Sequence, residues 1–419
     1  MSESLSGWNV YQLGQLIERG SAELQTGPFG TMLNSSEYTV TGTPVIAVQD
    51  IGENKLSHHK FVYVNETTVK RLSRYKVKES DIIFGRKGAV ERRAIIKTSE
   101  EGWLQGSDCI RLRFDDSIDA TFISYQFGSE SHREWMLQFA NGATMPSLNQ
   151  QILKLLPIRL PDLPEQKAIA AVLSSLDDKI DLLHRQNKTL ESMAETLFRQ
   201  WFIEEVQDYW EDGKIGDLIE NTFGGEWGKE NPEADYVIPV NCIRGTDIAD
   251  LQTGLAKKIP LRYTNKKKFA NIEPRNGDII FEISGGTENQ STGRAIYING
   301  DIKALFSYPL IFSNFCRLLR PLDKRYSYFI FLYLRYLYNQ DEFFCLENGS
   351  SGIKNLNYKA LLFDLKYPMP SKELVFRFNE SVSHYYSKIN QNKRQIITLE
   401  KLRDILLPKL MSGDVRIKN

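Results

Sequence analysis

Long apolar runs are absent from this sequence of 419 residues. The densest run, Tyr328 to Leu334, stops at Arg335 and is much shorter than the ~20 apolar residues that cross a membrane. The first residues also lack the basic segment and apolar stretch of a secretory signal. We therefore expect a cytoplasmic protein with no membrane segment.

Cysteine and histidine are too few and too scattered to form the usual ligand motifs. The four cysteines include no CxxC pair, and the five histidines include no HxxxH spacing. A disulfide framework or a zinc site is therefore not expected. An excess of one charge is also missing, because 53 basic residues balance 53 acidic ones. This balance argues against an indiscriminate nucleic-acid coat but leaves room for local basic faces.

Signatures of catalysis are equally missing. There is no GxxxxGK[ST] loop for ATP, no Asn-Pro-Pro-aromatic segment of an adenine methyltransferase and no GxSxG nucleophile motif. Pro161-Asp162 and Glu165-Gln166-Lys167 imitate the PD…ExK pattern of nucleases. These carboxylates stand at the start of a predicted helix, where they better suit its positive end than a metal ion. We expect no catalytic residue and no metal site in this chain.

What the sequence does contain is a second copy of its own first half. Gln12–Glu18 reads QLGQLIE and Lys214–Glu220 reads KIGDLIE. Further pairs follow in the same order: Val45–Val48 with Val237–Val240, Ser80–Phe84 with Gly277–Phe281, Arg93–Ile95 with Arg294–Ile296, Leu148-Asn149 with Leu356-Asn357, and Thr189–Glu191 with Thr398–Glu400. An interval of about 200 residues is far longer than a solenoid unit of roughly 20–50 residues and indicates a duplicated domain.

Each copy begins with a mixed α/β region. Short segments rich in Val, Ile and Phe, bounded by turn-forming residues, predict strands. These segments are Val45–Val48, Asp81–Phe84 and Cys109–Phe114 in the first copy, and Val237–Val240, Asp278–Ile283 and Phe315–Leu319 in the second. Helices are predicted at Ala120–Phe139 and Tyr326–Tyr338.

Each copy ends in a long predicted helix. Residues 165–212 contain neither Gly nor Pro, and their apolar residues recur at steps of three and four, the a/d spacing of a coiled coil. This stripe comprises Ile169, Leu173, Leu176, Ile180, Leu183, Asn187, Leu190, Ala194, Leu197 and Trp201. The matching stripe of the second copy comprises Phe378, Val382, Tyr385, Ile389, Asn392, Ile396, Leu399, Arg403, Leu406 and Leu410. Pro408 falls near the end of that helix, and Gly413 is its predicted stop.

Each stripe alone would leave an apolar face in water, so we expect the two helices to pair. Antiparallel pairing is favoured because a whole domain separates them along the chain. Asn187 and Asn392 each interrupt a stripe once, and such a buried Asn fixes the register of a coiled coil. The alternative is that each helix packs onto its own domain. A paired seam of ~33 residues would form a strut ~50 Å long.

In order and in composition these features resemble the specificity subunit of type I restriction–modification systems over the whole chain. The motifs that carry the resemblance are Gln25–Gly30 (QTGPFG), Gly142–Asn149 (GATMPSLN), Leu160–Gln166 (LPDLPEQ), Leu197–Phe202 (LFRQWF) and Leu407–Gly413 (LPKLMSG). In the second copy, Gly224–Gly228 and Pro368–Glu373 depart from the pattern. The resemblance implies an α+β fold with two pseudo-symmetric mixed α/β target-recognition domains, residues 1–160 and 208–370. They are separated by an antiparallel coiled coil of the family's two long conserved helices, residues 161–207 and 371–419.

The resemblance also implies a DNA reader without catalytic activity of its own. Each recognition domain would read one half of a bipartite, asymmetric target in double-stranded DNA. The helices would set the spacing and dock two modification subunits, which bind S-adenosylmethionine and methylate adenine. Restriction subunits, which use ATP and magnesium, would join the same complex. No cofactor is expected in this chain.

Basic and amide residues in two loops are the candidates for DNA contact. Arg and Lys suit phosphates, Arg pairs with guanine, and Asn or Gln pairs with adenine. In the first copy the candidates are Arg86, Lys87, Arg92 and Arg93, which follow a predicted strand. In the second copy one group of candidates is Arg262, Lys266, Lys267 and Lys268. The other group is Asn289, Gln290 and Arg294, which together with Glu288 stand at the position of the first basic loop. A solvated hairpin tip and a plain surface charge run are the alternatives.

Phe29 and Trp227 lie among the glycines Gly27, Gly30, Gly224, Gly225 and Gly228. These glycines predict turns, or a close backbone approach to DNA. For the two aromatic residues, burial in the local core is favoured over DNA contact. Two function classes remain beside the DNA reader: a coiled-coil scaffold without DNA binding, and a fused enzyme, for which the two repeats leave no room.

Overall fold

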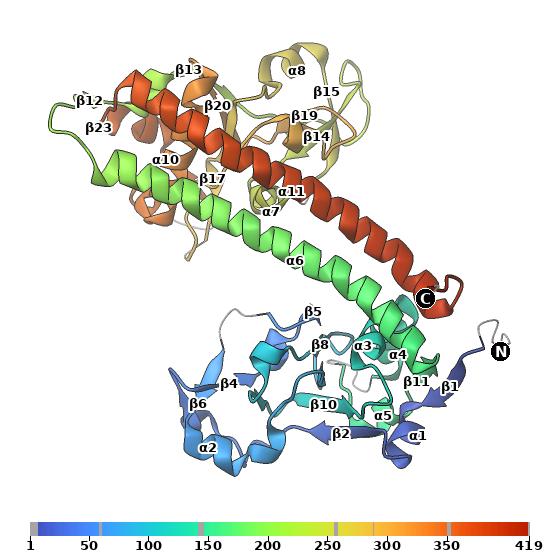
Figure 1. Ribbon diagram of the computed structural model, residues 1–419. Helices are drawn as coiled ribbons and strands as arrows, with labels where there is room; N and C mark the ends of the chain where they lie inside the picture. The colour runs from blue at the N-terminus through green and yellow to red at the C-terminus, as the bar shows by residue number, and fades with distance from the viewer. Residues whose placement is uncertain are drawn as a thin grey trace. The chain divides into compact units, whose positions relative to one another are not determined.

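The computed structural model describes residues 7–57, 61–140, 146–254, 259–287, 289–349 and 353–417 (Figure 1). Gly142–Met145 of one family-like motif and Glu288 of the second candidate loop lie outside the described residues. The chain divides into two compact units. The first comprises residues 1–180 and 399–419, and the second comprises residues 181–398. Each unit therefore holds one recognition region and a part of both long helices.

The first unit is built on a five-stranded sheet of order β2-β10-β7-β8-β5 and a four-stranded sheet of order β3-β6-β4-β9; β1 and β11 form a separate pair. Its strands are β1 (Asn9–Gln12), β2 (Ala22–Thr26), β3 (Tyr38–Thr39), β4 (Thr43–Ile46), β5 (Glu53–Asn54), β6 (Val62–Val64), β7 (Ile82–Gly85), β8 (Arg93–Ile95), β9 (Leu104–Gln105), β10 (Cys109–Phe114) and β11 (Pro157–Leu160). Its short helices are α1 (Leu13–Glu18), α2 (Glu66–Arg71), α3 (Ala120–Phe127), α4 (Glu130–Phe139) and α5 (Gln150–Lys154).

The second unit repeats this plan with a sheet of order β13-β20-β16-β18 and a sheet of order β15-β14-β19; β17-β22-β21 and β12-β23 are smaller. Its strands are β12 (Asp212–Gly213), β13 (Ile219–Gly224), β14 (Ile238–Ile243), β15 (Leu261–Thr264), β16 (Ile279–Glu282), β17 (Ser284–Gly285), β18 (Ala295–Tyr297), β19 (Leu310–Phe312), β20 (Cys316–Pro321), β21 (Glu347–Asn348), β22 (Lys354–Leu356) and β23 (Tyr367–Pro368). Its short helices are α7 (Ile248–Thr253), α8 (Lys266–Ile272), α9 (Gly300–Lys303) and α10 (Ser327–Asn339).

The predicted strands are found close to their expected places, and one predicted helix is divided. Ala120–Phe139 forms α3 and α4 instead of one helix, with a break at Gly128 and Ser129. The chain leaves the helix at Ser129, whose ψ of +151° is extended, whereas Gly128 keeps helical angles. A Cβ on Gly128 would lie 2.1 Å from a guanidinium nitrogen of Arg93, so a glycine at this position leaves room for the buried arginine.

The same buried ion pair organises the main sheet of both units. Asp81, next to β7, accepts two hydrogen bonds from Arg113 of β10, at 2.6 and 2.7 Å. Asp278, next to β16, accepts two from Arg320 of β20, at 3.1 and 2.7 Å. Each carboxylate also accepts a hydrogen bond from the backbone N–H of the residue three positions earlier, Lys78 or Arg275. The repeated Asp-Ile-Ile-Phe sequence is therefore a structural motif, in which a buried carboxylate joins two adjacent strands.

The two long helices are α6 (Leu163–Arg199), which continues into the π-helical turn η5 (Gln200–Glu204), and α11 (Lys372–Ser412). Pro408 lies inside α11, and the helix ends just before Gly413, whose φ of +80° is the left-handed conformation of a helix stop. Every predicted seam residue is buried or half-buried. None of the helices in the described ranges is long and apolar enough to span a membrane.

In the first unit the beginning of α6 packs against the end of α11. Ile169 and Leu173 of α6 share one core with Leu410 and Met411 of α11. Further along α6, Asp177 accepts a hydrogen bond of 2.9 Å from Arg403 of α11. The residue numbers rise on one helix as they fall on the other, so the pairing is antiparallel, as expected.

In the second unit the same antiparallel pairing continues. The side-chain amide of Asn392 donates to that of Asn187 over 2.9 Å, and both residues are buried. Toward the end of α6, the rings of Phe198 and Phe378 lie 6.0 Å apart. The two asparagines therefore face each other, which is the arrangement that fixes register in a coiled coil.

The helices of the second unit also pack onto their own domain, so both expected arrangements occur together. Phe202 of η5 contacts Phe329 of α10, with ring centroids 4.8 Å apart. Phe198, Phe202 and Tyr386 are more buried than the seam positions Leu197, Trp201 and Tyr385 beside them. The a/d pattern missed these residues because a helix that contacts two neighbours needs a wider apolar face than a two-helix seam.

We expect Asp81→Ala to destabilise the first unit by about 3–5 kcal/mol, because it leaves Arg113 partly buried without its carboxylate. Lys70→Ala is the matched control, since its ion pair with Glu66 is fully at the surface and such pairs contribute about 0–1 kcal/mol. Urea unfolding followed by circular dichroism measures both. Equal midpoints for the two variants would contradict the structural role of Asp81.

We expect Asn392→Leu to lower the free energy of unfolding by about 1–3 kcal/mol, because Asn187 loses its buried partner. The double variant Asn187→Leu/Asn392→Leu should recover most of that loss, since no buried amide then lacks a partner. Thermal unfolding of the three proteins checks the order. A double variant less stable than the single one would show that the amide pair stabilises the helices in its own right.

Candidate nucleic-acid interface

Each unit has a glycine where its first long strand leaves the main sheet. A Cβ on Gly27 would lie 1.9 Å from the carbonyl oxygen of Gly106, and one on Gly225 would lie 2.0 Å from that of Ser313. Next to these contacts, the N–H of Gly27 donates to Cys109 and the N–H of Glu226 donates to Phe312, over 2.9 and 2.8 Å. The close approach that glycine allows at these two positions is to the protein's own backbone.

The aromatic residues beside these glycines are not core residues. Phe29 is 65% exposed and Trp227 is 37% exposed. Burial in the local core, the favoured prediction for both, is wrong, because both rings are exposed. In each unit the glycine is pressed against the neighbouring strand, and the aromatic residue two positions later is at the surface.

The basic loop of the first unit is held in place by the segment that precedes α5. The N–H of Arg86 donates to Asp108, and the carbonyl of Arg86 accepts the N–H of Leu148 over 2.8 Å. Gly88, at φ +80°, donates to Pro146 over 3.1 Å. Lys87 and Arg92 are exposed and Arg86 is half-buried. Lys87 Nζ lies 3.7 Å from the carboxylate of Asp108 in an exposed ion pair. The loop thus presents two exposed cationic side chains, Lys87 and Arg92, on a fixed backbone.

Arg93 differs from its neighbours, because it belongs to β8 and points into the unit. Its side chain is buried, and its Nε donates to the carbonyl oxygen of Ser124 over 2.5 Å. Burial lowers the pKa of its guanidinium to about 10. In this position Arg93 cannot reach a phosphate, so the prediction that it contacts DNA is corrected: it holds α3 against the sheet.

The corresponding loop of the second unit presents amides instead of cations. Asn289 and Gln290 are exposed, and Gln290 Nε2 donates to the Tyr338 hydroxyl over 3.3 Å. Arg294, the counterpart of Arg93, is partly buried and makes two hydrogen bonds to the buried Glu282, at 3.0 and 2.8 Å. These bonds raise the pKa of Arg294 and fix its direction. Arg294 therefore supports the loop, and Asn289 and Gln290 are the side chains at its surface.

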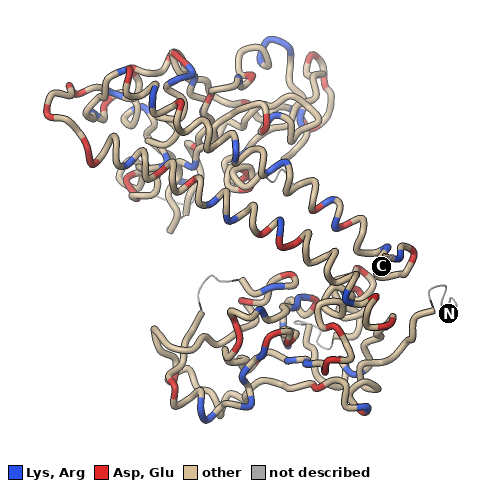
Figure 2. Tube along the Cα trace, in the orientation of Figure 1, with Lys and Arg blue, Asp and Glu red and all other residues tan. Residues whose placement is uncertain are grey.

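The second basic group divides in the same way. Lys266 and Lys267, at the start of α8, are exposed, and Figure 2 shows a blue stretch there. Lys268 donates to Glu226 over 2.8 Å, and that hydrogen bond raises its pKa. Arg262 is bound to Glu230 over 2.7 Å and stacks 4.7 Å from the centre of the Trp227 ring. Two of the four predicted cations are thus already engaged within the protein.

Sequence reasoning missed two arginines that brace the loop of Phe29. Arg71, the last residue of α2, donates to the carbonyl of Met32 over 2.6 Å, and Arg74 donates to Gln25 over 3.0 Å. A signal for them was present. Asn65 caps α2 and Asn265 caps α8, and each asparagine side chain accepts the backbone N–H of the residue three positions later. The two helices are therefore equivalent in the two copies, and both contain basic residues.

No group of three or more His, Cys, Asp or Glu side chains in the described part of the chain is placed to hold a metal ion. Burial raises the pKa of the thiols of Cys109, Cys242 and Cys316 to about 12, which disfavours the thiolate form. What both units do share is a pinned loop that carries polar side chains at the surface.

The family of the chain follows from its similarity to known proteins. A family model described as the type I restriction modification DNA specificity domain matches residues 6–192 and again residues 207–401. The chain is 27% identical over 329 residues to the type I restriction enzyme MjaIX specificity subunit of Methanocaldococcus jannaschii, an alignment that covers 72% of this chain and 71% of that protein. It is 24% identical over 403 residues to the StySPI specificity subunit of Salmonella potsdam, covering 89% and 82%.

The fold has a counterpart among solved structures. The crystal structure of the S subunit of a type I restriction-modification system from M. genitalium superposes with a TM-score of 0.61 and 16% identity, covering 98% of this chain and 97% of that one. The family match extends over both units, in agreement with the internal repeat. The chain therefore belongs to the type I restriction modification DNA specificity family, and its role is to give such a system its DNA-sequence specificity.

Proposed function

We propose that each unit reads one half of a bipartite, asymmetric DNA target. The observation that carries this proposal is the contrast between the buried and exposed parts of the two copies. Four strands of the main sheet follow the same order in both, β2-β10-β7-β8 and β13-β20-β16-β18, and both units contain the Asp–Arg pair. The surface loops differ, with Lys87 and Arg92 in the first copy and Asn289 and Gln290 in the second. Two similar scaffolds with different surface chemistry suit two different half-sites.

The chemistry of the exposed side chains assigns roles within each half-site. Asn289 and Gln290 match the edge of adenine in the major groove, where a side-chain amide donates and accepts at once. Arg92 suits guanine, which offers two acceptors to a guanidinium. Lys87, Lys266 and Lys267 suit phosphates, which position a protein on the duplex without reading its sequence. Arg93 and Arg294 are bound inside their units, to Ser124 and Glu282, and are not assigned to DNA contact.

The helices α6 and α11 would set the distance between the two half-sites. A paired segment of ~33 residues is ~50 Å long, against ~34 Å for ten base pairs. We therefore expect two half-sites of roughly 3–5 base pairs within about 15 base pairs. The asparagine pair supports this function, because a fixed register keeps the length of the strut constant.

The complex would supply the chemistry that this chain lacks. Its modification subunits would bind S-adenosylmethionine and methylate adenine, and its restriction subunits would use ATP and magnesium. In this proposal the chain itself is non-catalytic, holds no cofactor and works in the cytoplasm. The absence of a methyltransferase or ATP-binding motif in the sequence supports that division of labour.

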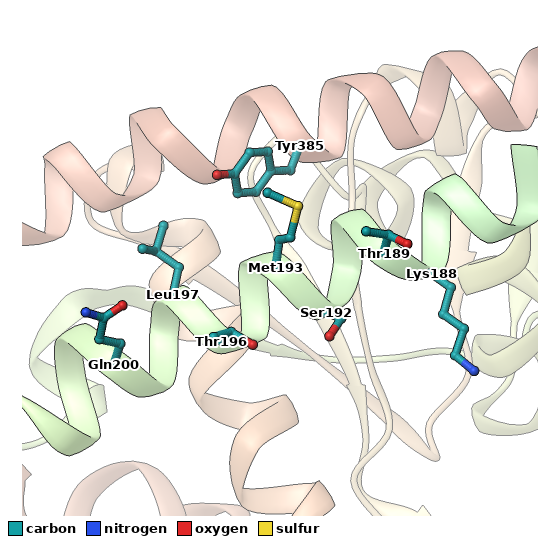
Figure 3. Close-up of a pocket in the computed structure, with 8 residues that line it drawn as sticks. All are labelled: Lys188, Thr189, Ser192, Met193, Thr196, Leu197, Gln200 and Tyr385. Atoms are coloured by element: carbon teal, nitrogen blue, oxygen red, sulfur yellow. The ribbon is translucent and has the colours of Figure 1, made fainter.

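Docking of two modification subunits is supported by an exposed apolar position that occurs once in each helix. Met193 of α6 and Leu402 of α11 both follow the Thr-Leu-Glu motif by two residues. They are 45% and 43% exposed. Around Met193 lies a groove of about 550 Å³, lined also by Leu197, Thr189 and Tyr385. Figure 3 shows Met193 pointing toward the helix that carries Tyr385.

A DNA-binding experiment tests the half-site assignment. We expect Asn289→Ala/Gln290→Ala to reduce discrimination in one half-site by about 1–3 kcal/mol, because amide contacts to a base are lost. The other half-site should be read as before. Fluorescence anisotropy of the subunit with its modification partner, on duplexes substituted in one half-site at a time, measures this. Uniform weakening on every duplex would contradict a base contact.

Lys87→Ala should act differently, because phosphate contacts carry no sequence information. We expect weaker binding to all duplexes. The slope of log affinity against log salt concentration should decrease in magnitude by about one. Titrations at several salt concentrations measure the slope. Lys167→Ala, an exposed lysine at the start of α6, is the control and should leave the slope unchanged. A change of specificity in Lys87→Ala would reassign that residue to base readout.

Met193→Asp and Leu402→Asp test the docking sites. Each should remove one modification subunit from the complex, and the double variant should remove both, because a carboxylate would be buried without a partner. Size-exclusion chromatography with light scattering gives the mass of each complex. Leu155→Asp, at an exposed leucine on neither long helix, should change nothing. Retention of both partners by the double variant would place the docking surface elsewhere.

A further inference from the structure

We propose that Phe29 and Trp227 are a matched pair of aromatic DNA contacts, one in each half-site, that touch bases directly. This inference rests on the proposed function, because it needs each unit to lie on its own half-site. It adds an apolar contact to the recognition surface, because the family assignment names no residue that contacts DNA.

The two residues occupy equivalent positions in the repeated fold. Each follows the first strand of the main sheet, β2 or β13, and each lies two residues after the glycine that is pressed against the opposite backbone. Neither position faces the core of its own unit. An exposed aromatic residue at the same place in both copies points to a shared use, since an isolated exposed one needs no explanation.

The backbone that carries each ring is held by hydrogen bonds. The carbonyl of Phe29 accepts the N–H of Met32 over 2.7 Å and that of Leu33 over 3.3 Å. After Trp227, Gly228 takes a φ of +71°, and Lys229 then exchanges two backbone hydrogen bonds of 2.9 Å with Tyr263 of β15. Both rings are therefore presented on preformed turns, so little conformational freedom is lost when they meet a ligand.

Cationic side chains lie near each turn, and three of them, Arg71, Arg262 and Lys268, also pair with acids of the protein. Arg71 and Arg74 brace the Phe29 loop and both are exposed, although Arg71 also pairs with Glu37. Arg262 lies over the Trp227 ring. Lys268 of α8 is bound to Glu226, and Glu230 engages Arg262, so each of these two cations near Trp227 already has an acidic partner. Exposed rings next to cations are the combination with which proteins contact bases and phosphates together.

The chemistry of the two rings differs in a way that suits different half-sites. Phenylalanine has no hydrogen-bonding group, so Phe29 makes only apolar contact, as with a thymine methyl group or the face of an unstacked base. The indole N–H of Trp227 can also donate to an acceptor on a base edge. The first contact is therefore purely apolar, whereas the second adds a polar one.

The test uses the complete subunit bound to its modification partner and three duplexes: the full target, one with the first half-site scrambled and one with the second scrambled. Phe29→Ala should weaken binding to the full target by about tenfold or more, the usual size of a lost base–aromatic contact. On the duplex with the scrambled first half-site it should bind like the wild type. Trp227→Ala should show the mirror-image pattern. Phe29→Leu, which keeps an apolar side chain, should lose less than Phe29→Ala.

Two exposed aromatic residues serve as controls, Phe139→Ala in the first unit and Tyr209→Ala in the second. Neither should affect binding to any duplex. Equal weakening on all three duplexes, or no weakening on the full target, would overturn the inference while leaving the half-site assignment intact. A wild-type protein that binds all three duplexes equally would overturn the proposed function itself, and the inference with it.

Discussion

The pairing of α6 with α11 is the interaction on which both recognition regions depend. In each unit, side chains from both helices are part of the main hydrophobic core. The last turns of the chain therefore complete the core of the first unit, although the whole second region precedes them in the sequence. Contacts between such distant segments form late, because a long loop must close before they contribute. The first region thus reaches its full stability only once the entire chain has folded.

A second consequence concerns how the recognition surface can vary. The helix seam and the buried Asp81–Arg113 and Asp278–Arg320 pairs contribute to stability without reaching the surface loops. Substitutions in these loops therefore leave the scaffold intact, whereas substitutions in the buried pairs affect the whole unit. A protein that must read many different targets on one fold needs this separation of stability from specificity.

The parts of the fold that could be predicted from the sequence are those with a strong period or a repeated motif. The heptad stripes placed the two helices, because the a/d spacing is sustained over many turns. The intervening domain indicated their antiparallel direction, but the contact between Asn187 and Asn392 was seen only in the folded structure. The break at Ser129 was missed, because one Gly-Ser pair in an otherwise helical pattern does not by itself end a helix. Phe198 and Phe202 were also missed, because they are buried by α10 as well as by Phe378 of the partner helix.

The candidate site was harder to predict, for a reason that the duplication itself makes clear. Residues that recur in both copies, such as Arg93 and Arg294, are bound inside their units and serve the shared scaffold. Residues that read an asymmetric target have to differ between the copies, so the repeat cannot reveal them. Phe29 and Trp227 combine the two conditions, because they share a position but differ in chemistry. Their exposure depends on a turn pinned at a glycine, which only the folded backbone shows. A residue that is equivalent in position, exposed in both copies and different in chemistry is therefore the strongest candidate for specificity in a duplicated reader.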